Sequence, residues 1–470
     1  MSMGRRFEPG SVLEGFELLE RLPSGGMASI WRARKSGLDV PVIVKMPFLD
    51  PGQDVSVIIG YEMEEMISRR LSGPHVPQFF GFGDLRHIPY IAMEFVEGTS
   101  VAEFVDSAPL PAEEVQRIGI EAAKALISLH AQKVAHLDLK PENIILAERG
   151  AVLIDYGLAH HAELPDLLAE ESTVPMGSAA YIAPEQVLGE RGDPASDIFA
   201  LGCILYQLAT GEEPFGRPQT SAGMRRRLFH PPAEPRKLNP SIPRWLQQIV
   251  ENCMEVDRSR RYSDASQLAH DLSHPDQVRL VNRPAPPARG FWAALLRRFS
   301  QPDRPARKAA SAGRGPSIVV AAVDLSPAPG RLAEEIRNET ARLLAARHDS
   351  RLACVTVLKT EIIGDQPDAD AEGRSIYVKQ LVALRDWAHG LHLGEGRASF
   401  HVLEAVSPAD AILDFVARNH AGHIVMGARG SSAFRRHLGS VSTKVVAEAR
   451  CSVSVVRVLS FEGEETQPDS

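Results

Sequence analysis

Three side chains that could act on a phosphate group stand close together in one short run. Asp138, Lys140 and Asn143 place an acid, a base and an amide in the same segment. Such an acid can accept a hydroxyl proton, such a lysine can neutralise a phosphoryl group, and the amide can hold a metal ion. Asp155 follows an apolar strand-like run, and a carboxylate there suits Mg²⁺. Together these residues predict phosphoryl-transfer chemistry.

A lysine at the end of an earlier strand-like run adds a charge that this chemistry requires. Lys45 ends the run, and the helical stretch Tyr61–Leu71 that follows carries Glu62, Glu64 and Glu65. Phosphoryl transfer depends on positioning and on neutralising charge, so a lysine held by an acid beside the phosphates is expected. From residue type alone, any of the three glutamates could be its partner.

The ordered series of motifs resembles a bacterial eukaryotic-like Ser/Thr protein kinase over residues 12–275. Ala183-Pro184-Glu185 matches the motif that closes the activation segment of that family. Asp197 matches the buried aspartate that supports the catalytic loop, and Arg261 would pair with Glu185. The resemblance implies these roles: Lys45 on the α- and β-phosphates, Glu64 as its ion-pair partner, Asp138 as catalytic base, Lys140 on the γ-phosphate, and Asn143 and Asp155 as magnesium ligands.

The stretch Met93-Glu94-Phe95-Val96 resembles the hinge of the same family. Its backbone would bind adenine, so Met93, Glu94 and Val96 are candidate contacts. The resemblance implies ATP as the phosphate donor, with Mg²⁺ or alternatively Mn²⁺ as the metal. The acceptors would be Ser and Thr hydroxyls of protein substrates, because Lys140 stands two residues after the catalytic aspartate, as a lysine does in Ser/Thr-specific members.

The phosphate loop departs from the family pattern G-x-G-x-x-G. Pro23, Gly25 and Ala28 occupy the three glycine positions, and Gly25 and Gly26 are left as candidate phosphate contacts at the loop tip. Proline removes a backbone N–H and fixes φ, and Ala28 adds a Cβ where the backbone should approach phosphate. Weaker ATP binding is therefore expected.

A second departure lies beside the catalytic aspartate. Leu137 stands where most of the family has an arginine that pairs with a phosphorylated activation loop. Without that arginine, little dependence on activation-loop phosphorylation is expected. Ser172, Thr173 and Ser178 are candidate autophosphorylation sites, with simple loop hydroxyls as the alternative. Ser178 can still hydrogen-bond near Asp138.

Composition narrows the class of protein. A chain of 470 residues with 44% hydrophobic and 24% charged residues suits two or three globular domains. The net charge of −8 gives no support for nucleic-acid binding. The four cysteines form no CxxC pair, which excludes a disulfide framework or zinc site and favours a cytoplasmic location. No apolar run reaches the ~20 residues that a transmembrane helix needs.

A basic, proline-rich stretch at residues 281–315 predicts a linker. Residues 290–299 within it form a short basic amphipathic run, which either docks on the chain's own first domain or makes a weak peripheral membrane contact. Before the linker, strand-like runs precede helical ones, so a β-rich lobe followed by an α-rich lobe is expected. The expected organisation is an N-terminal extension (1–11), a kinase domain (12–280, N-lobe 12–95 and C-lobe 96–280), the linker (281–315), an α/β domain (316–458) and an acidic tail (459–470).

Strand-like and helical runs alternate through residues 316–458, which predicts a parallel sheet flanked by helices. The region resembles the universal stress protein family, with a flavodoxin-like α/β fold. Eight residues, 431–438, separate two of its glycines, one fewer than is usual in that family. The resemblance implies a second adenine nucleotide bound by Asp324, Gly427, Gly430, Gly439 and Ser440.

Three readings of the whole chain remain. In the first, an active Ser/Thr kinase carries a C-terminal nucleotide-binding stress-sensing domain, which pairs through its last strand, Val453–Val458, into a homodimer. In the second, Pro23, Ala28 and Leu137 mark a pseudokinase scaffold. In the third, the C-terminal domain is a nucleotide-gated adaptor and the main actor. The intact charged residues favour the first, because electrostatic stabilisation is usually the largest catalytic effect.

Overall fold

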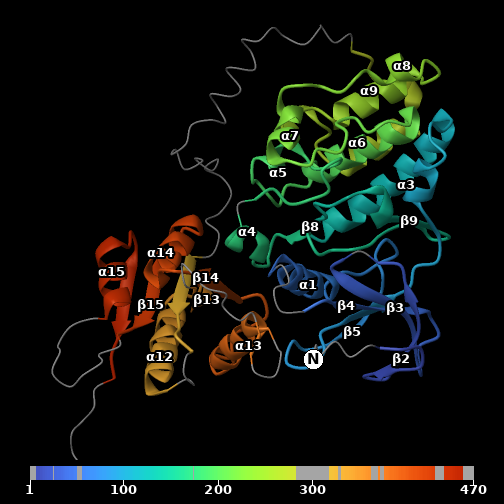
Figure 1. The fold of residues 1–470 in the computed structure, drawn as a ribbon. Helices are drawn as coiled ribbons and strands as arrows, with labels where there is room; N and C mark the ends of the chain where they lie inside the picture. Colours follow the sequence, from blue (N-terminus) through green and yellow to red (C-terminus); the bar gives the residue numbers. More distant parts are fainter. Residues whose placement is uncertain are drawn as a thin grey trace, which may run out of the picture. The chain divides into compact units, whose positions relative to one another are not determined.

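The computed structural model describes residues 7–24, 26–49, 55–172, 174–281, 317–325, 330–360, 369–370, 375–428 and 439–458. The chain divides into two compact units (Figure 1): of the described residues, those in 7–48 and 55–281 belong to the N-terminal unit, and those in 317–458 belong to the C-terminal unit. Except for Val281, the predicted linker lies outside the described residues, as does the acidic tail.

The N-terminal unit begins with an antiparallel sheet. Along β2, Phe16 and Leu18 are buried while Glu17 is partly exposed, so one face of the strand covers a core that also contains Trp31 and Val44. The six strands, in sheet order, are β1 (Val12–Leu13), β2 (Phe16–Leu22), β3 (Ala28–Lys35), β4 (Val42–Pro47), β6 (Ile91–Glu94) and β5 (Phe79–Phe82). Helix α1 (Val55–Ser68) connects β4 to β5.

A helical lobe follows in the same unit. Helix α6 (Ala195–Thr210) is buried along its whole length apart from its first residue, as expected for a helix that is apolar on every side. Helix α3 (Ala112–Ala131) packs against it with a stripe that includes Val115, Ile118 and Leu126. The other helices are α2 (Val101–Val105), α4 (Leu167–Glu171), α5 (Pro184–Val187), α7 (Ser221–Arg225), α8 (Pro235–Leu238), α9 (Arg244–Cys253) and α10 (Ala265–Ser273).

Short strands and 3₁₀ turns carry the loops between these helices. The strands are β7 (Thr99–Ser100), β8 (Val134–Ala135), β9 (Ile144–Ala147), β10 (Gly150–Leu153) and β11 (His160–His161). The turns are η1 (Pro141–Asn143), η2 (Arg226–Leu228), η3 (Arg258–Arg260) and η4 (Pro275–Gln277). The β9–β10 hairpin lies between the predicted catalytic residues and Asp155, so it sets their separation.

The C-terminal unit is a five-stranded parallel sheet with helices on both faces. Successive residues of its central strand enter opposite cores: Val319 and Ala321 pack with α12 and α13, while Val320 and Ala322 pack with α14 and α15. The strands, in sheet order, are β14 (Ala398–Ala405), β13 (Ser350–Lys359), β12 (Ser317–Ala322), β15 (His423–Gly427) and β16 (Ser452–Val456). The helices are α12 (Arg331–Ala346), α13 (Ile376–His389), α14 (Pro408–Arg418) and α15 (Ser440–Glu448).

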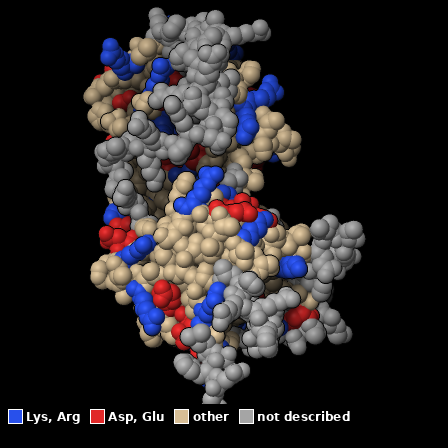
Figure 2. Space-filling view, turned by 90° about the vertical axis from the view of Figure 1, so that its left-hand side faces the viewer, with Lys and Arg blue, Asp and Glu red and all other residues tan. Residues whose placement is uncertain are grey.

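Both fold predictions are confirmed: a β-rich lobe precedes an α-rich lobe, and a parallel α/β domain follows. The helix predicted at Tyr61–Leu71 begins earlier, at Val55, and ends at Ser68. Within the described ranges, no helix is long and apolar enough to cross a membrane. Figure 2 shows basic and acidic side chains interspersed on the face that it presents.

Candidate active site

Lys45 lies between two carboxylates. Its Nζ is 2.7 Å from Oε2 of Glu64 and 2.8 Å from Oδ1 of Asp155. These residues come from β4, α1 and the segment after β10, so the contact joins the sheet, its helix and the helical lobe. Of the three candidate glutamates, Glu64 is the one that reaches Lys45, and the predicted ion pair is present.

The charge on Lys45 is stabilised by the two carboxylates beside it. Burial alone would lower the pKa of the Lys45 amine, but the carboxylates of Glu64 and Asp155 outweigh it and raise that pKa, so the amine is protonated. Lys45 in turn lowers the pKa of Asp155 to about 2, against the opposing effect of burial. Asp155 is therefore ionised at neutral pH and presents an anionic oxygen.

Asp138, Lys140 and Asn143 meet at the 3₁₀ turn η1. Lys140 Nζ lies 3.2 Å from Oδ2 of Asp138, and Asn143 Nδ2 donates to the backbone oxygen of Asp138 at 3.0 Å. Asp138 Oδ1 accepts a hydrogen bond from the backbone amide of Ser178 at 2.7 Å. Ser178 does bond to Asp138 as expected, although through its amide rather than its hydroxyl. This amide fixes one carboxylate oxygen, and the other faces Lys140.

A buried aspartate supports the loop that carries Asp138 through hydrogen bonds to its backbone. Asp197 accepts the backbone N–H of His136 and of Leu137, each at 2.8 Å, as its predicted supporting role requires. His130 Nε2 lies 2.8 Å from the same carboxylate, a contact that no sequence motif indicated. Leu137 has a φ of 61°, a left-handed conformation that these hydrogen bonds stabilise.

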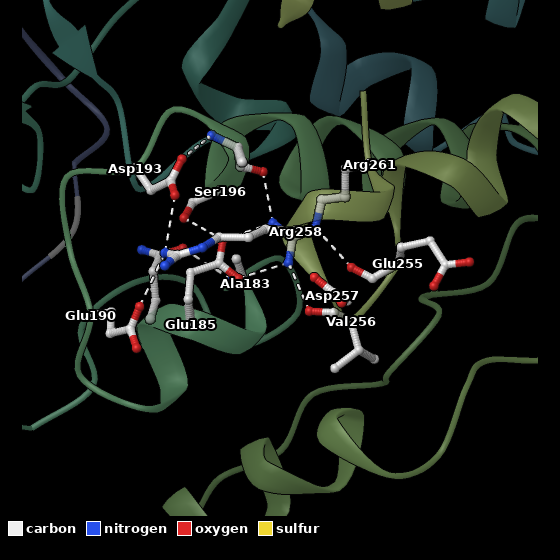
Figure 3. A network of polar contacts seen from close by, with 12 residues as sticks. Ala183, Glu185, Glu190, Asp193, Ser196, Glu255, Val256, Asp257, Arg258 and Arg261 are labelled. Atoms are coloured by element: carbon white, nitrogen blue, oxygen red, sulfur yellow. Dashed lines mark hydrogen bonds and ion pairs between the residues drawn. The ribbon is translucent and has the colours of Figure 1, made fainter. Parts of the chain in front are cut away.

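The end of the activation segment is fixed by a buried ion pair (Figure 3). The terminal guanidinium nitrogens Nη1 and Nη2 of Arg261 lie 2.7 Å from Oε1 and Oε2 of Glu185, respectively. Ser196 Oγ donates to the same carboxylate, and Arg261 also donates to the backbone oxygens of Ala195 and Glu255. The predicted pairing of Arg261 with Glu185 is confirmed.

The predicted hinge continues from β6, where Met93 is buried. The Glu94 carboxylate accepts two hydrogen bonds from Arg149, at 2.6 and 2.9 Å, and one from the Gln78 amide at 3.1 Å. Burial acts to raise the pKa of Glu94, but these donors outweigh it and lower the pKa. The Glu94 side chain is therefore engaged within the protein, and the backbone amides of Glu94 and Phe95 donate to the oxygens of Gln78 and Pro41, each at 2.8 Å.

The phosphate loop lies between β2 and β3. Gly25 is outside the described residues. At Gly26 an added Cβ would meet nothing within 4 Å, so the chain there is open. Ala28 begins β3 and is only 8% exposed, which places its methyl group inside the lobe. Pro23 precedes the tip and has no N–H to offer to a phosphate.

An ion pair that the sequence did not predict holds the middle of the activation segment. Arg191 Nε lies 3.0 Å from Oδ2 of Asp166, and Nη2 donates to the Leu158 oxygen at 2.8 Å. The side chains of Arg191 and Asp166 are only 10% and 12% exposed. The leucines of α4 join the same buried cluster as α1. No motif marks Arg191, because its partner lies far back in the sequence.

Asp155 and Asn143 offer the oxygens that a hard divalent cation prefers. Asp155 is ionised, and Oδ1 of Asn143 accepts no hydrogen bond from the described residues. Mg²⁺ usually keeps several waters and takes one or two protein ligands together with substrate phosphates, so this pair of donors fits it. Within the described ranges, no group of three or more His, Cys, Asp or Glu side chains is placed to hold a metal.

In the C-terminal unit, Asp324 and Gly427 lie at the carboxyl ends of β12 and β15, which are hydrogen-bonded neighbours. Strand β12 is central in the sheet. The next two strands, β13 and β14, lie on one side of it, and the strands that follow, β15 and β16, lie on the other side, so the strand order reverses at β12. Ligands of parallel α/β sheets bind at such a reversal. Gly439 and Ser440 begin α15, while Gly430 lies outside the described residues.

Comparison with known proteins decides the family. A protein kinase domain model matches residues 16–273, more than half of the chain. The chain belongs to the protein kinase family. A universal stress protein family model matches residues 317–457, so a kinase domain is followed by a universal stress protein domain. Membership of the kinase family implies the use of ATP and a divalent metal.

Curated relatives agree with this assignment. A probable serine/threonine-protein kinase of Clostridium perfringens is 32% identical over 259 residues, which cover 55% of this chain and 38% of that protein. PknB of Mycolicibacterium smegmatis is 27% identical over 368 residues, covering 76% and 56% respectively. PrkC of Bacillus subtilis is 29% identical over 260 residues, covering 55% and 40%. The chain thus spans about half or less of these relatives' length.

Among solved structures, the kinase domain of PknI from Mycobacterium tuberculosis matches 57% of this chain and 99% of its own length. Its sequence identity to this chain is 22% and the TM-score is 0.46.

Proposed function

We propose that this chain transfers the γ-phosphate of ATP to Ser and Thr hydroxyls of proteins. The observation that carries the proposal is the cluster of Lys45, Glu64 and Asp155, in which Lys45 lies within 2.8 Å of both carboxylates and Asp155 also interacts electrostatically with Lys140. The curated relatives, which are named serine/threonine-protein kinases, support the same reaction.

In the proposed reaction, the hydroxyl oxygen of the substrate attacks the γ-phosphorus as the bond to the β–γ bridging oxygen breaks, and ADP leaves. Asp138 would accept the hydroxyl proton, since its Oδ2 is not used by the Ser178 amide. Lys140, 3.2 Å from that carboxylate, would neutralise the transferred phosphoryl group. Lys45 would hold the α- and β-phosphates.

We assign the metal to Asp155 and Asn143, with Mg²⁺ as the proposed ion. When bound, Mg²⁺ would neutralise the negative charge that develops during transfer. The contribution of the chain is to keep Asp155 ionised through Lys45, and to orient Asn143 through its hydrogen bond to the backbone of Asp138.

A pseudokinase scaffold is the competing function. Pro23, Ala28 and Leu137 were its support in the sequence, and none of them disturbs the charged cluster. Ala28 is buried and Leu137 sits in a loop supported by Asp197, so both are accommodated by the fold. The active reading is therefore the one we propose.

The direct test is the site of phosphate incorporation. The full chain is incubated with Mg²⁺ and ATP, and its phosphorylated residues are identified by mass spectrometry. Phosphate on Ser and Thr supports the proposal. Nucleotide binding without any phosphate incorporation would support the scaffold instead.

For the universal stress protein domain we propose adenine-nucleotide binding, supported by the position of Asp324 and Gly427 at the sheet reversal. We also propose that the domain pairs with a second copy through β16. Among the described residues, β16 bonds to β15 alone, so its other edge is open to a further strand.

A further inference from the structure

Arg227 is a buried guanidinium in the helical lobe, in the 3₁₀ turn η2 that follows α7. It is 2% exposed, whereas its neighbours Arg225 and Arg226 are exposed. Arginine is rarely buried unless its charge is paired. The part played by Arg227 therefore depends on what surrounds its side chain.

The guanidinium of Arg227 is directed at backbone oxygens. Nη1 donates to the Ile182 oxygen at 2.5 Å, Nη2 donates to the Ala179 oxygen, and Nε donates to the Met224 oxygen at 3.1 Å. Among the described residues, no carboxylate forms an ion pair with it. Burial consequently lowers its pKa, although arginine stays charged in proteins. Two of its three bonds reach a segment far back in the chain.

That segment, residues 177–183, will be called the docking segment. Its first part lies against the candidate catalytic base, because the Ser178 amide donates to Asp138. The Ser178 oxygen accepts the amides of Tyr181 and Ile182, each at 2.9 Å, which closes a turn. The turn therefore lies next to the carboxylate that would accept the substrate proton. Arg227 holds carbonyls at both ends of the turn.

A stack of aromatic rings and guanidinium groups connects Arg227 to the Arg261–Glu185 ion pair at the end of the activation segment. Arg227 Cζ lies 4.9 Å from the centre of the Phe215 ring. Phe215 stacks on Phe199 with ring centres 5.7 Å apart, and Arg261 Cζ lies 5.0 Å from Phe199. Arg227 binds the docking segment and Arg261 binds Glu185, two residues beyond it, so the two cations flank one aromatic pair and hold adjacent parts of the chain.

We propose that Arg227 is a positioning residue for the protein substrate: it fixes the docking segment relative to Asp138, so that the acceptor hydroxyl is aligned with the base. This inference rests on the proposed kinase function. Nucleotide binding does not depend on it, because none of the polar contacts of Arg227 involves Lys45, Asp155 or the hinge.

The geometry requires arginine rather than lysine at this position. A guanidinium has five N–H donors in a planar fork and can stack on a ring, whereas an ammonium is a point charge. A lysine could reach one of the two carbonyls, but could not hold both while covering Phe215. Replacing Arg227 by Lys should therefore fail to restore the function, although it keeps the charge.

The kinetic test compares Arg227→Met and Arg227→Lys with a matched control, Arg226→Met, on the same turn. Myelin basic protein serves as substrate and the full chain is used. We expect KM for the protein substrate to rise by about tenfold or more in both Arg227 variants, because charge-assisted bonds are lost. KM for ATP and the slow hydrolysis of ATP without protein should match wild type. A parallel loss of ATP hydrolysis and substrate phosphorylation would mean a merely structural role and overturn the inference.

Amide hydrogen exchange tests, without relying on catalysis, whether Arg227 fixes the docking segment. In Arg227→Met, the amides of Ser178 and Ile182 should exchange faster by about tenfold or more, while those of α3 and α6 stay protected. Unchanged exchange in the docking segment would contradict the proposal. If the wild-type chain transferred no phosphate, the proposed kinase function would be wrong. The exchange measurement would still test whether Arg227 fixes the docking segment.

Discussion

Lys45 shows how much one residue organises at this site. It binds carboxylates from α1 and from the segment after β10, so its position reports whether the two lobes are correctly assembled. Asp155 is ionised because Lys45 lies beside it. Lys45 is protonated because the carboxylates of Glu64 and Asp155 raise its pKa. Removal of the lysine would leave two like charges close together, with the Glu64 carboxylate buried.

Replacing Lys45 by Met should abolish phosphoryl transfer, by about a hundredfold or more, because transition-state charge is no longer neutralised. The variant should also reverse a pH dependence of stability. In the wild type, the depressed pKa of Asp155 stabilises the fold above about pH 4, and this contribution is lost as the pH falls to about 2. In the variant, burial beside Glu64 raises that pKa, so acidification should stabilise it instead.

Urea unfolding between acidic and neutral pH measures this difference. Lys237→Met is the matched control, because Lys237 and Glu234 form an exposed pair of little energetic weight. Identical pH profiles for Lys45→Met and wild type would contradict the assigned coupling.

The residues that belong to motifs could be predicted from the sequence, and those that act through tertiary contacts could not. Glu64, Asp197 and Arg261 were predicted because the family resemblance fixed their partners. Arg191 and Arg227 were missed, since their bonds run to backbone oxygens or to a carboxylate far away in sequence. A side chain that binds main-chain oxygens leaves no recognisable pattern of residue types.

At the scale of elements, the activation segment is held without a phosphate. The leucines of α4 pack with α1, and Asp166 forms an ion pair with Arg191. Leu137, at the position of the missing arginine, is buried and bonded to Asp197 through its amide. We therefore predict that the described part of this segment keeps its position without a phosphorylated residue.

Treatment with a phosphatase should accordingly leave the rate of substrate phosphorylation within about twofold of the untreated chain. Arg191→Ala should lower both this rate and the free energy of unfolding, the latter by about 3 kcal/mol, because Asp166, only 12% exposed, loses its ion-pair partner. Arg260→Ala, at an exposed position, should change neither. Activity that disappears with dephosphorylation would refute the phosphate-independent arrangement.

Most element types were predicted correctly, and errors fell at boundaries. Helix α1 begins at Val55 rather than Tyr61, because the apolar residues of its first turns are compatible with a strand when only the sequence is considered. The alternation of strands and helices in the C-terminal unit was predicted correctly, since parallel α/β units have apolar strands separated by amphipathic helices. Strand order, by contrast, depends on tertiary pairing, which no local pattern of residue types specifies.

At the scale of the whole molecule, the two units have separate cores. The buried clusters of the N-terminal unit draw on residues up to Val278, and those of the C-terminal unit begin at Val319. Each unit therefore contains the apolar contacts that stabilise it, and each should fold without the other.

Calorimetry should show two unfolding transitions for the full chain and one for a fragment ending at Asn282, before Pro284. ATP without added metal should raise the melting temperature of the transition that the fragment lacks, because a ligand stabilises the unit that binds it. Asp324→Ala should remove that shift. A single cooperative transition for the full chain would show instead that the units are energetically coupled, and no ATP effect would exclude the second nucleotide site.

The measurement that tests the central claim most directly is phosphate transfer from labelled ATP to a generic basic protein by the wild-type chain and by Asp138→Asn. Asp276→Asn, an exposed aspartate outside the site, serves as the control. The account predicts incorporation by the wild type and the control, and a loss of about a hundredfold or more in Asp138→Asn with ATP binding retained. Equal incorporation by Asp138→Asn, or none by the wild type despite ATP binding, would contradict it.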